Sequence, residues 1–168
     1  MKRIGLLSDT HAFLDAKVFQ YFAECDEIWH AGDIGSVEVA DRLADFKPLV
    51  AVSGNIDGHV IRRMFPVFQR FMCEEVDVFL THIGGYPDNY AYEVREYIKK
   101  NPPKLFVCGH SHILKVQYDQ KLQLLHINPG AAGKSGFQQV RTLVRFTVDG
   151  EKIKDLEVIN LPLSETVL

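Results

Sequence analysis

The chain lacks any apolar run long enough to span a bilayer, and its basic runs do not exceed pairs such as Arg62-Arg63. With 19 basic and 22 acidic residues the net charge is −3, which argues against an extended nucleic-acid footprint. The apolar stretch near the start is too short for a signal peptide and runs directly into Asp9 and His11. We therefore expect neither a membrane partner nor a targeting segment.

Cysteine is also scarce: there are three, at positions 25, 73 and 108, without CxxC spacing. An odd number of cysteines in apolar surroundings predicts reduced core thiols in a cytoplasmic protein. Repeats, linkers and low-complexity stretches are absent as well. A length of 168 residues with 46% hydrophobic content suits one sizeable core, so we expect a single domain over residues 1–168.

Apolar runs of strand length alternate with helical patterns in the first third of the chain. The apolar spacing predicts helices over residues 15–25 and 37–46, with Asp15 and Ser36 as N-caps. Strands are expected before, between and after these helices, at residues 3–9, 27–33 and 49–53. This βαβαβ order implies a parallel sheet.

The remainder is richer in strands. A hairpin is expected where residues 67–73 and 76–82 flank Glu74-Glu75, followed by a helix over residues 90–100 that Pro102 and Pro103 end. Residues 105–110 form another buried apolar run. The last part is antiparallel, with turns near Asp119-Gln120 and at Asp149-Gly150.

Polar residues follow five of these strands, at the ends where ligands bind in open α/β sheets. Asp9 and His11, like His110 and His112, are two residues apart, so in extended backbone both members of a pair can reach one ion. Taken singly, each has an ordinary alternative, such as helix capping for Asp9 or a turn for Asn55. Together they provide carboxylate, amide and imidazole ligands for first-row divalent metals: Asp9, His11, Asp33, Asn55, His82, His110 and His112.

The motif order DTH, GD, GN, H and GHSH resembles that of the calcineurin-like metallophosphoesterase superfamily, and within it the small YfcE-type phosphodiesterases. The resemblance covers essentially the whole chain. It implies a four-layer αββα sandwich with two mixed β-sheets and a site at one edge. The implied activity is hydrolysis of phosphoesters, most often phosphodiesters, by a water or hydroxide held between two metal ions.

The resemblance also implies a ligand set for each ion, with Asp33 shared by both. The ligand chemistry suits Mn, Fe, Zn or Ni about equally, and the family favours Mn. The first ion would take Asp9, His11, Asp33 and His112, and the second Asp33, Asn55, His82 and His110.

The sequence departs from the family beside Asn55. Many members carry a His at the next position, which is thought to protonate the leaving group, whereas here it is Ile56. His59 is the nearest replacement acid by sequence. Asn55 and Asp57 are candidate substrate contacts, although a hydrogen bond within the loop or a turn also explains Asp57. Ala131 stands where the family often has Ser, which puts a phosphate-loop hydroxyl there in doubt.

Two histidines outside the ligand set have ordinary explanations. His30 is expected to be a core histidine behind the ligands, and His126 a core or surface residue without a partner. Two alternatives to a phosphodiesterase stay open. One is a metal-dependent phosphomonoesterase, and the other is a protein-binding scaffold of the same fold, such as the small subunit of retromer. For an enzyme we expect a small phosphoester as partner, and self-association stays open.

Overall fold

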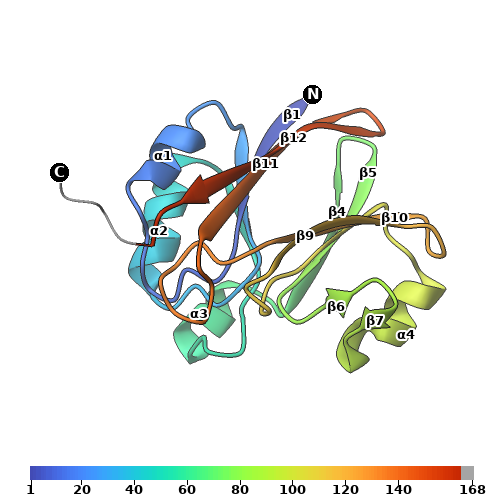
Figure 1. The fold of residues 1–168 in the computed structure, drawn as a ribbon, viewed down its shortest axis with the longest axis horizontal. Coiled ribbons are helices and arrows are strands. Elements are labelled where there is room, and N and C mark those ends of the chain that lie inside the picture. Colours follow the sequence, from blue (N-terminus) through green and yellow to red (C-terminus); the bar gives the residue numbers. More distant parts are fainter. Residues whose placement is uncertain (164–168) are drawn as a thin grey trace.

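The computed structural model describes residues 1–163, and two five-stranded sheets form its centre (Figure 1). In the first sheet the order is β12-β11-β1-β2-β3, and β1, β2 and β3 run parallel, as the βαβαβ pattern predicts. The last two strands, β11 and β12, add to β1 in antiparallel fashion. The bounds are β1 Lys2–Leu7, β2 Glu27–His30, β3 Leu49–Ala51, β11 Arg141–Asp149 and β12 Lys152–Leu161.

The second sheet has the order β4-β5-β8-β10-β9 and is also mixed. Strand β8 pairs in parallel with β5 and β10, whereas β4 and β9 form antiparallel edges. The hairpin expected at Glu74-Glu75 joins β4 to β5. The bounds are β4 Phe68–Cys73, β5 Val76–Thr81, β8 Leu105–Val107, β9 Leu114–Asp119 and β10 Leu124–Pro129.

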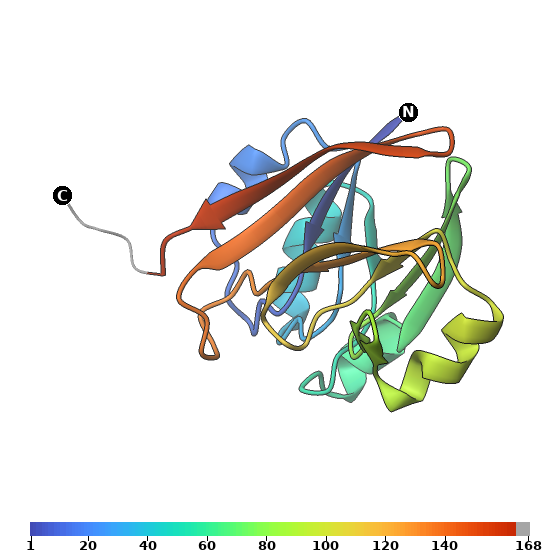
Figure 2. The ribbon, with the colours of Figure 1, turned by 45° about the vertical axis from the view of Figure 1, so that its right-hand side comes forward.

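Helices cover the outer faces of both sheets, with α1 and α2 on the first and α4 on the second (Figure 2). Helix α2, Val37–Phe46, has the predicted bounds, and the Ser36 hydroxyl accepts the backbone N–H of Val39 at its start. Helix α4 is Tyr92–Lys100, two residues shorter at its start than expected. The αββα architecture implied by the sequence is therefore confirmed.

Strand alternation explains why the sheets can be buried on both faces. In β1, Ile4 and Leu6 enter the core between the sheets, whereas Leu7 joins the core beneath α1 and α2. In β8, Leu105 and Val107 face the first sheet, and Phe106 packs under α4. Successive residues of each continuous apolar run therefore pack on opposite faces of a sheet, and together the runs fill three separate core layers.

Three local expectations need correction. Helix α1 spans only Lys17–Tyr21, and Asp15 does not cap it; one Asp15 oxygen accepts the Lys17 N–H and the other pairs with the buried Arg141, 2.8 Å away. A short helix that was not predicted, α3, spans His59–Met64. The Gly-rich loop contains a small hairpin, β6 (Gly85–Tyr86) and β7 (Asn89–Tyr90).

Across the described part of the chain, the helices are all too short or too polar to cross a bilayer. The three cysteines are buried and free, as expected of core thiols.

Candidate metal centre

The strand ends bring the predicted ligands together in two adjoining clusters. Asp9, His11 and His112 form one cluster, and Asp33, His82 and His110 the other. Within each cluster the ligand atoms lie within 4.8 Å of one another. Asn55 joins the second cluster, because its Oδ1 lies 3.0 Å from Nδ1 of His110. The convergence expected from strand polarity therefore holds for all of these side chains.

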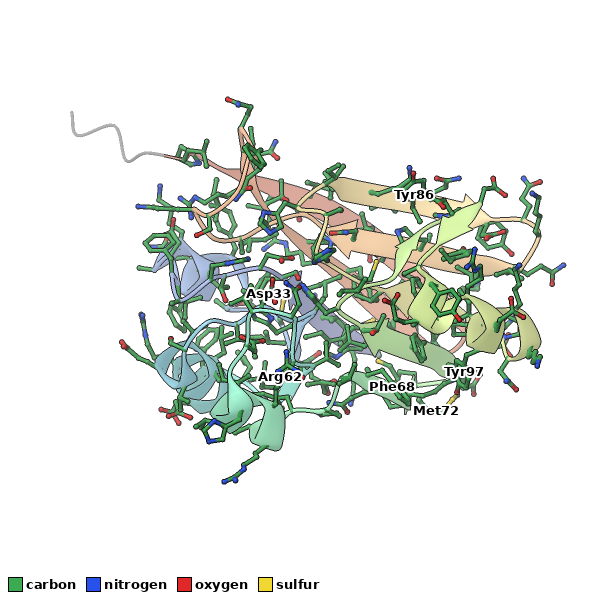
Figure 3. All side chains as sticks on the ribbon, turned by 90° about the horizontal axis from the view of Figure 1, so that it is seen from below. Asp33, Arg62, Phe68, Met72, Tyr86 and Tyr97 are labelled. Atoms are coloured by element: carbon green, nitrogen blue, oxygen red, sulfur yellow. The ribbon has the colours of Figure 1, made fainter. Side chains whose placement is uncertain are left out.

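Asp33, labelled in Figure 3, belongs to the second cluster and also faces an imidazole of the first. Its Oδ2 is 3.4 Å from Nε2 of His11 in one cluster and 3.2 Å from Nε2 of His82 in the other. Its Oδ1 accepts the backbone N–H of Ile56. One oxygen is therefore anchored to the loop, and the other is left to face both imidazoles.

Asp9 shows the same division between an anchored oxygen and a free one. Its Oδ2 accepts from the Ser8 hydroxyl at 2.6 Å and the His110 N–H at 3.1 Å. Its Oδ1 points at the imidazoles, 3.1 Å from Nε2 of His112 and 3.7 Å from Nε2 of His11. A carboxylate fixed in this way presents one lone-pair side to an ion without needing to reorient.

Hydrogen bonds behind the imidazoles set which nitrogen faces the site. Nδ1 of His82 lies 2.7 Å from the carbonyl oxygen of Ala31, and Nδ1 of His112 lies 3.0 Å from Oε1 of Gln138. Gln138 is itself oriented, because its amide donates to the carbonyls of Gly133 and Ser135. In both histidines Nε2 is thereby left as the ligand atom.

The ligand loops have a shared backbone signature. Asp9, His11, Asp33, His110 and His112 all have positive φ, between 46° and 70°. This left-handed conformation is uncommon for residues other than glycine, and it persists only where surrounding structure enforces it. Here it turns the chain sharply after each strand and directs the side chain into the site.

Two glycines allow the close packing behind the carboxylates. A Cβ on Gly54 would lie 2.0 Å from Oδ1 of Asp33, and one on Gly109 would lie 2.1 Å from the Ser8 hydroxyl and 2.7 Å from Oδ2 of Asp9. The glycines of the GN and GHSH motifs therefore leave room for the carboxylates in addition to allowing the turns.

Charge balance in the site depends on the imidazoles. Burial alone would raise the pKa of Asp9, but His11 and His112 hold it well below its usual range. Burial also favours a higher pKa for Asp33, but the hydrogen bond with His82 lowers it. Contact with Asp9 raises the pKa of His112. Burial disfavours the charged form of His82, but contact with Asp33 outweighs burial and raises the pKa of His82. The carboxylates are therefore ionised and attract positive charge.

The donor set fits divalent metal ions. Oδ1 of Asp9 and Nε2 of His11 and of His82 are buried, and although charged neighbours lie close by, none makes a well-aligned hydrogen bond among the described residues. Leaving such atoms unpaired costs roughly 1–3 kcal/mol each, so a native structure needs a reason for them. All three atoms point at one another across the site, and a cation is the ligand that would satisfy oxygen and imidazole together.

The other candidate residues lie apart from this set. His59 is the exposed first residue of α3. Asp57 is buried, and its oxygens accept the N–H groups of Ile34, Gly35 and Gly54. Its carboxylate therefore ties the Asn55 loop to the Asp33 loop and is not presented to a substrate.

Both remaining histidines are buried. His30 lies 3.0 Å from the Thr10 hydroxyl and accepts the Gly32 N–H, as expected of a core histidine behind the ligands. His126 has no hydrogen-bond partner in the described residues. Burial lowers the pKa of each ring to about 4.

Sequence reasoning missed Gln138 and Arg62. Gln138 is 26 residues from His112, in a loop without a motif. Arg62 donates to the carbonyls of Gly54, Asn55 and Asp57 and so holds the Asn55 loop, and it belongs to the unpredicted helix α3. The pair Arg62-Arg63 followed by Pro66 is a helix-end signal that could have indicated α3.

A family model described as the calcineurin-like phosphoesterase superfamily domain matches residues 1–151. The chain belongs to this superfamily. Members hydrolyse phosphoesters with divalent metal ions, in agreement with the donor set. A protein of Methanothermobacter thermautotrophicus named "Probable metallophosphoesterase" is 29% identical, over 93% of this chain and 91% of its own length.

Solved structures share the calcineurin-like fold at lower identity. An archaeal phosphodiesterase superposes with a TM-score of 0.77 at 20% identity, covering 95% of this chain and 99% of its own. Vps29 from Entamoeba histolytica, solved in complex with Zn²⁺, has a TM-score of 0.71 at 14% identity and covers 96% and 99%. At these identities the likeness concerns the fold alone.

Proposed function

We propose that the chain is a phosphodiesterase with two divalent metal ions, Mn first among the candidates. The observation that carries the proposal is the position of Asp33, whose Oδ2 faces one imidazole from each cluster. Asp33 would be shared by the ions, because one carboxylate between two neighbouring dications would offset their mutual repulsion. Asp9, His11 and His112 complete the first site, and Asn55, His82 and His110 the second.

The residues of the chain prepare the site for a phosphate. When bound, the ions supply Lewis-acid neutralisation of phosphoryl charge and activation of water as the nucleophile. Asn55 provides a neutral oxygen, which avoids a third carboxylate where an anion must bind. The buried carboxylates and the fixed imidazoles hold this geometry before substrate arrives, so no reorganisation is needed during reaction.

The stoichiometry of metal binding tests the centre itself. We expect about two ions per chain after mild chelation and reloading with Mn, Zn, Fe or Ni, measured by elemental analysis. A content near zero for every metal would contradict the proposal.

The leaving group tests the chemistry. Ile56 is 47% exposed beside Asn55 and cannot donate a proton, and general acid catalysis typically contributes roughly 10²–10⁴-fold. We expect rates on substituted phenyl diesters to depend steeply on leaving-group pKa. Ile56→His should help poor leaving groups more than good ones. A flat dependence in the native enzyme would mean that another acid is in place, and His59→Ala would then show whether it is His59.

A protein-binding scaffold is the second candidate, supported by the likeness to Vps29. Because that Vps29 was solved with Zn²⁺, bound metal alone does not separate the two candidates. Turnover does. Diesters and monoesters assayed in parallel at saturating Mn should show hydrolysis with preference for diesters; preference for monoesters would favour the phosphomonoesterase, and no turnover on either the scaffold.

A further inference from the structure

A hollow of about 280 Å³ adjoins the metal centre on the side of β4. Asn55 and His82 form its inner end, and Val67, Phe68 and Val94 line it. Phe68 is 53% exposed, yet its ring stacks on the buried Phe79 with centroids 5.5 Å apart. We call this space the Phe68 hollow; it offers a fixed apolar wall directly beside two ligands.

The cation in the Phe68 hollow is already engaged. The Arg62 guanidinium donates to the carbonyls of Gly54, Asn55 and Asp57, and the other charged lining residue is Glu93. The guanidinium keeps its positive charge, but two of its nitrogens are committed to the loop backbone, and the wall described above is apolar. The hollow therefore suits an uncharged apolar group.

A second hollow of about 380 Å³ adjoins the centre on the other side of α4. His110 and Ser111 form its inner end, and Tyr86, Tyr92 and Arg95 line it. Tyr92 is 82% exposed, and the guanidinium of Arg95 lies 5.6 Å from the centroid of its ring. We call this space the Tyr92 hollow; exposed aromatic faces beside a cation suit a planar, electron-rich ring.

Both hollows include candidate ligands of the second cluster among their lining residues. Ile83 lines both, and α4 contributes Val94 to one and Tyr92 to the other. Phe68 and Tyr86 lie well apart, on either side of α4 (Figure 3). A group bound between the ligands can thus extend in two directions, and each hollow is of the size that holds part of a small molecule.

We propose, resting on the phosphodiesterase function, that the substrate class is a small diester whose two arms occupy different hollows. An apolar arm occupies the Phe68 hollow, and a planar aromatic arm, such as an aryl group or nucleobase, lies against Tyr92 and Arg95. A monoester fills only one hollow. Preference for diesters then comes from the second arm, since net charge at the metals attracts both classes.

Binding of non-hydrolysable probes tests the two hollows. Dibenzylphosphinate has two benzyl arms and no ester bond, and benzyl(methyl)phosphinate has one benzyl arm and the same charge. By titration calorimetry on the Mn-loaded protein, dibenzylphosphinate should bind more tightly. Phe68→Ala and Tyr92→Ala should each weaken it about tenfold, whereas only one of them should weaken benzyl(methyl)phosphinate.

Matched controls separate the hollows from general surface effects. Met72→Ala changes a residue on the same strand as Phe68, and Tyr118→Ala removes an exposed tyrosine from β9. Neither Met72 nor Tyr118 lines a hollow. Both controls should bind dibenzylphosphinate like the native protein. The proposal is overturned if either test variant also binds it as the native protein does, if the controls lose as much, or if the two probes bind equally.

The hydrolysis of bis(4-nitrophenyl) phosphate by the same proteins distinguishes this inference from the function on which it rests. We expect kcat/KM to fall about tenfold in each test variant, through KM. Turnover that is unchanged in both variants overturns the two-armed substrate and leaves the phosphodiesterase standing. Absent turnover with the expected binding pattern rejects hydrolysis and retains the two-armed site.

Discussion

The two sheets contribute different chemistry to the same centre. The first sheet provides every oxygen ligand, through the loops after β1, β2 and β3, together with His11. The second provides imidazoles only, through the loops after β5 and β8. Negative charge therefore lies on one side of the sandwich, and apart from His11 its protonatable partners lie on the other. An ion bound between them would join the sheets as well as serve the reaction.

Removing the shared charge should break this arrangement most severely. Asp33→Asn keeps the shape of the side chain but removes the carboxylate that faces both clusters. We expect a loss of several kcal/mol of transition-state stabilisation, about 10³-fold in kcat/KM at saturating Mn. His110→Gln, a change to one exposed ligand of the second sheet, should cost less.

Steady-state kinetics measure both variants, with far-ultraviolet circular dichroism to exclude unfolding. Near-normal turnover of Asp33→Asn, or a larger loss in His110→Gln, would contradict the central role of Asp33.

The two sheets can also be compared through the pH dependence of stability, because each contains one buried histidine outside the candidate ligands. Burial lowers the pKa of His126 to about 4, whereas the unfolded chain titrates near 6.5, so protons favour unfolding as pH falls through this window. His126→Phe removes this loss. At pH 4.5 the variant should gain about 2–3 kcal/mol in relative stability compared with pH 7.

Urea unfolding at the two pH values measures this difference. His30→Phe provides the comparison in the first sheet, because it also removes the acceptor of the buried Gly32 N–H and should destabilise the protein at pH 7 by roughly 1–3 kcal/mol. Equal pH profiles for native protein and His126→Phe would show that His126 is not titrating.

The smallest expected effect is on metal affinity, when the hydrogen bond that orients the His112 imidazole is removed. Gln138→Ala removes the acceptor at Nδ1 of His112 and frees the ring to turn. Metal affinity should fall roughly 10–100-fold, measured by competition with a chelator. Gln139→Ala, an exposed neighbour of the same type, is the matched control. If the two variants bind metal equally well, the Gln138 contact does not orient His112.

The layered fold and the convergence of the candidate ligands could be predicted because both follow from strand ends. Asp9, Asp33 and His82 each come at the end of an apolar run, and strand polarity alone brings such residues to one edge. The bounds of α2 were also readable, since Ser36 caps one end and Pro48 blocks the other.

What could not be predicted depends on contacts between distant loops. Asp15 looked like a helix cap, but Arg141, 126 residues away, is its partner. The Asp57 carboxylate links two loops 22 residues apart, which no local pattern shows. The two hollows depend on Tyr86, Tyr92 and Phe68, exposed aromatics whose positions beside the ligands follow only from tertiary packing.

The strand order has a consequence for how the chain is made. Strand β1 sits in the middle of its sheet, between β2 and β11, and its pairing with β11 joins Lys2 to Val148. The second sheet uses only residues 68–129. During synthesis, the strands of the second sheet leave the ribosome as one block, whereas β1 waits with an unpaired edge until residues 141–149 appear. Strand β1 is made before every other described strand but gains its second partner only after residues 141–149, and long sequence separation of this kind slows folding.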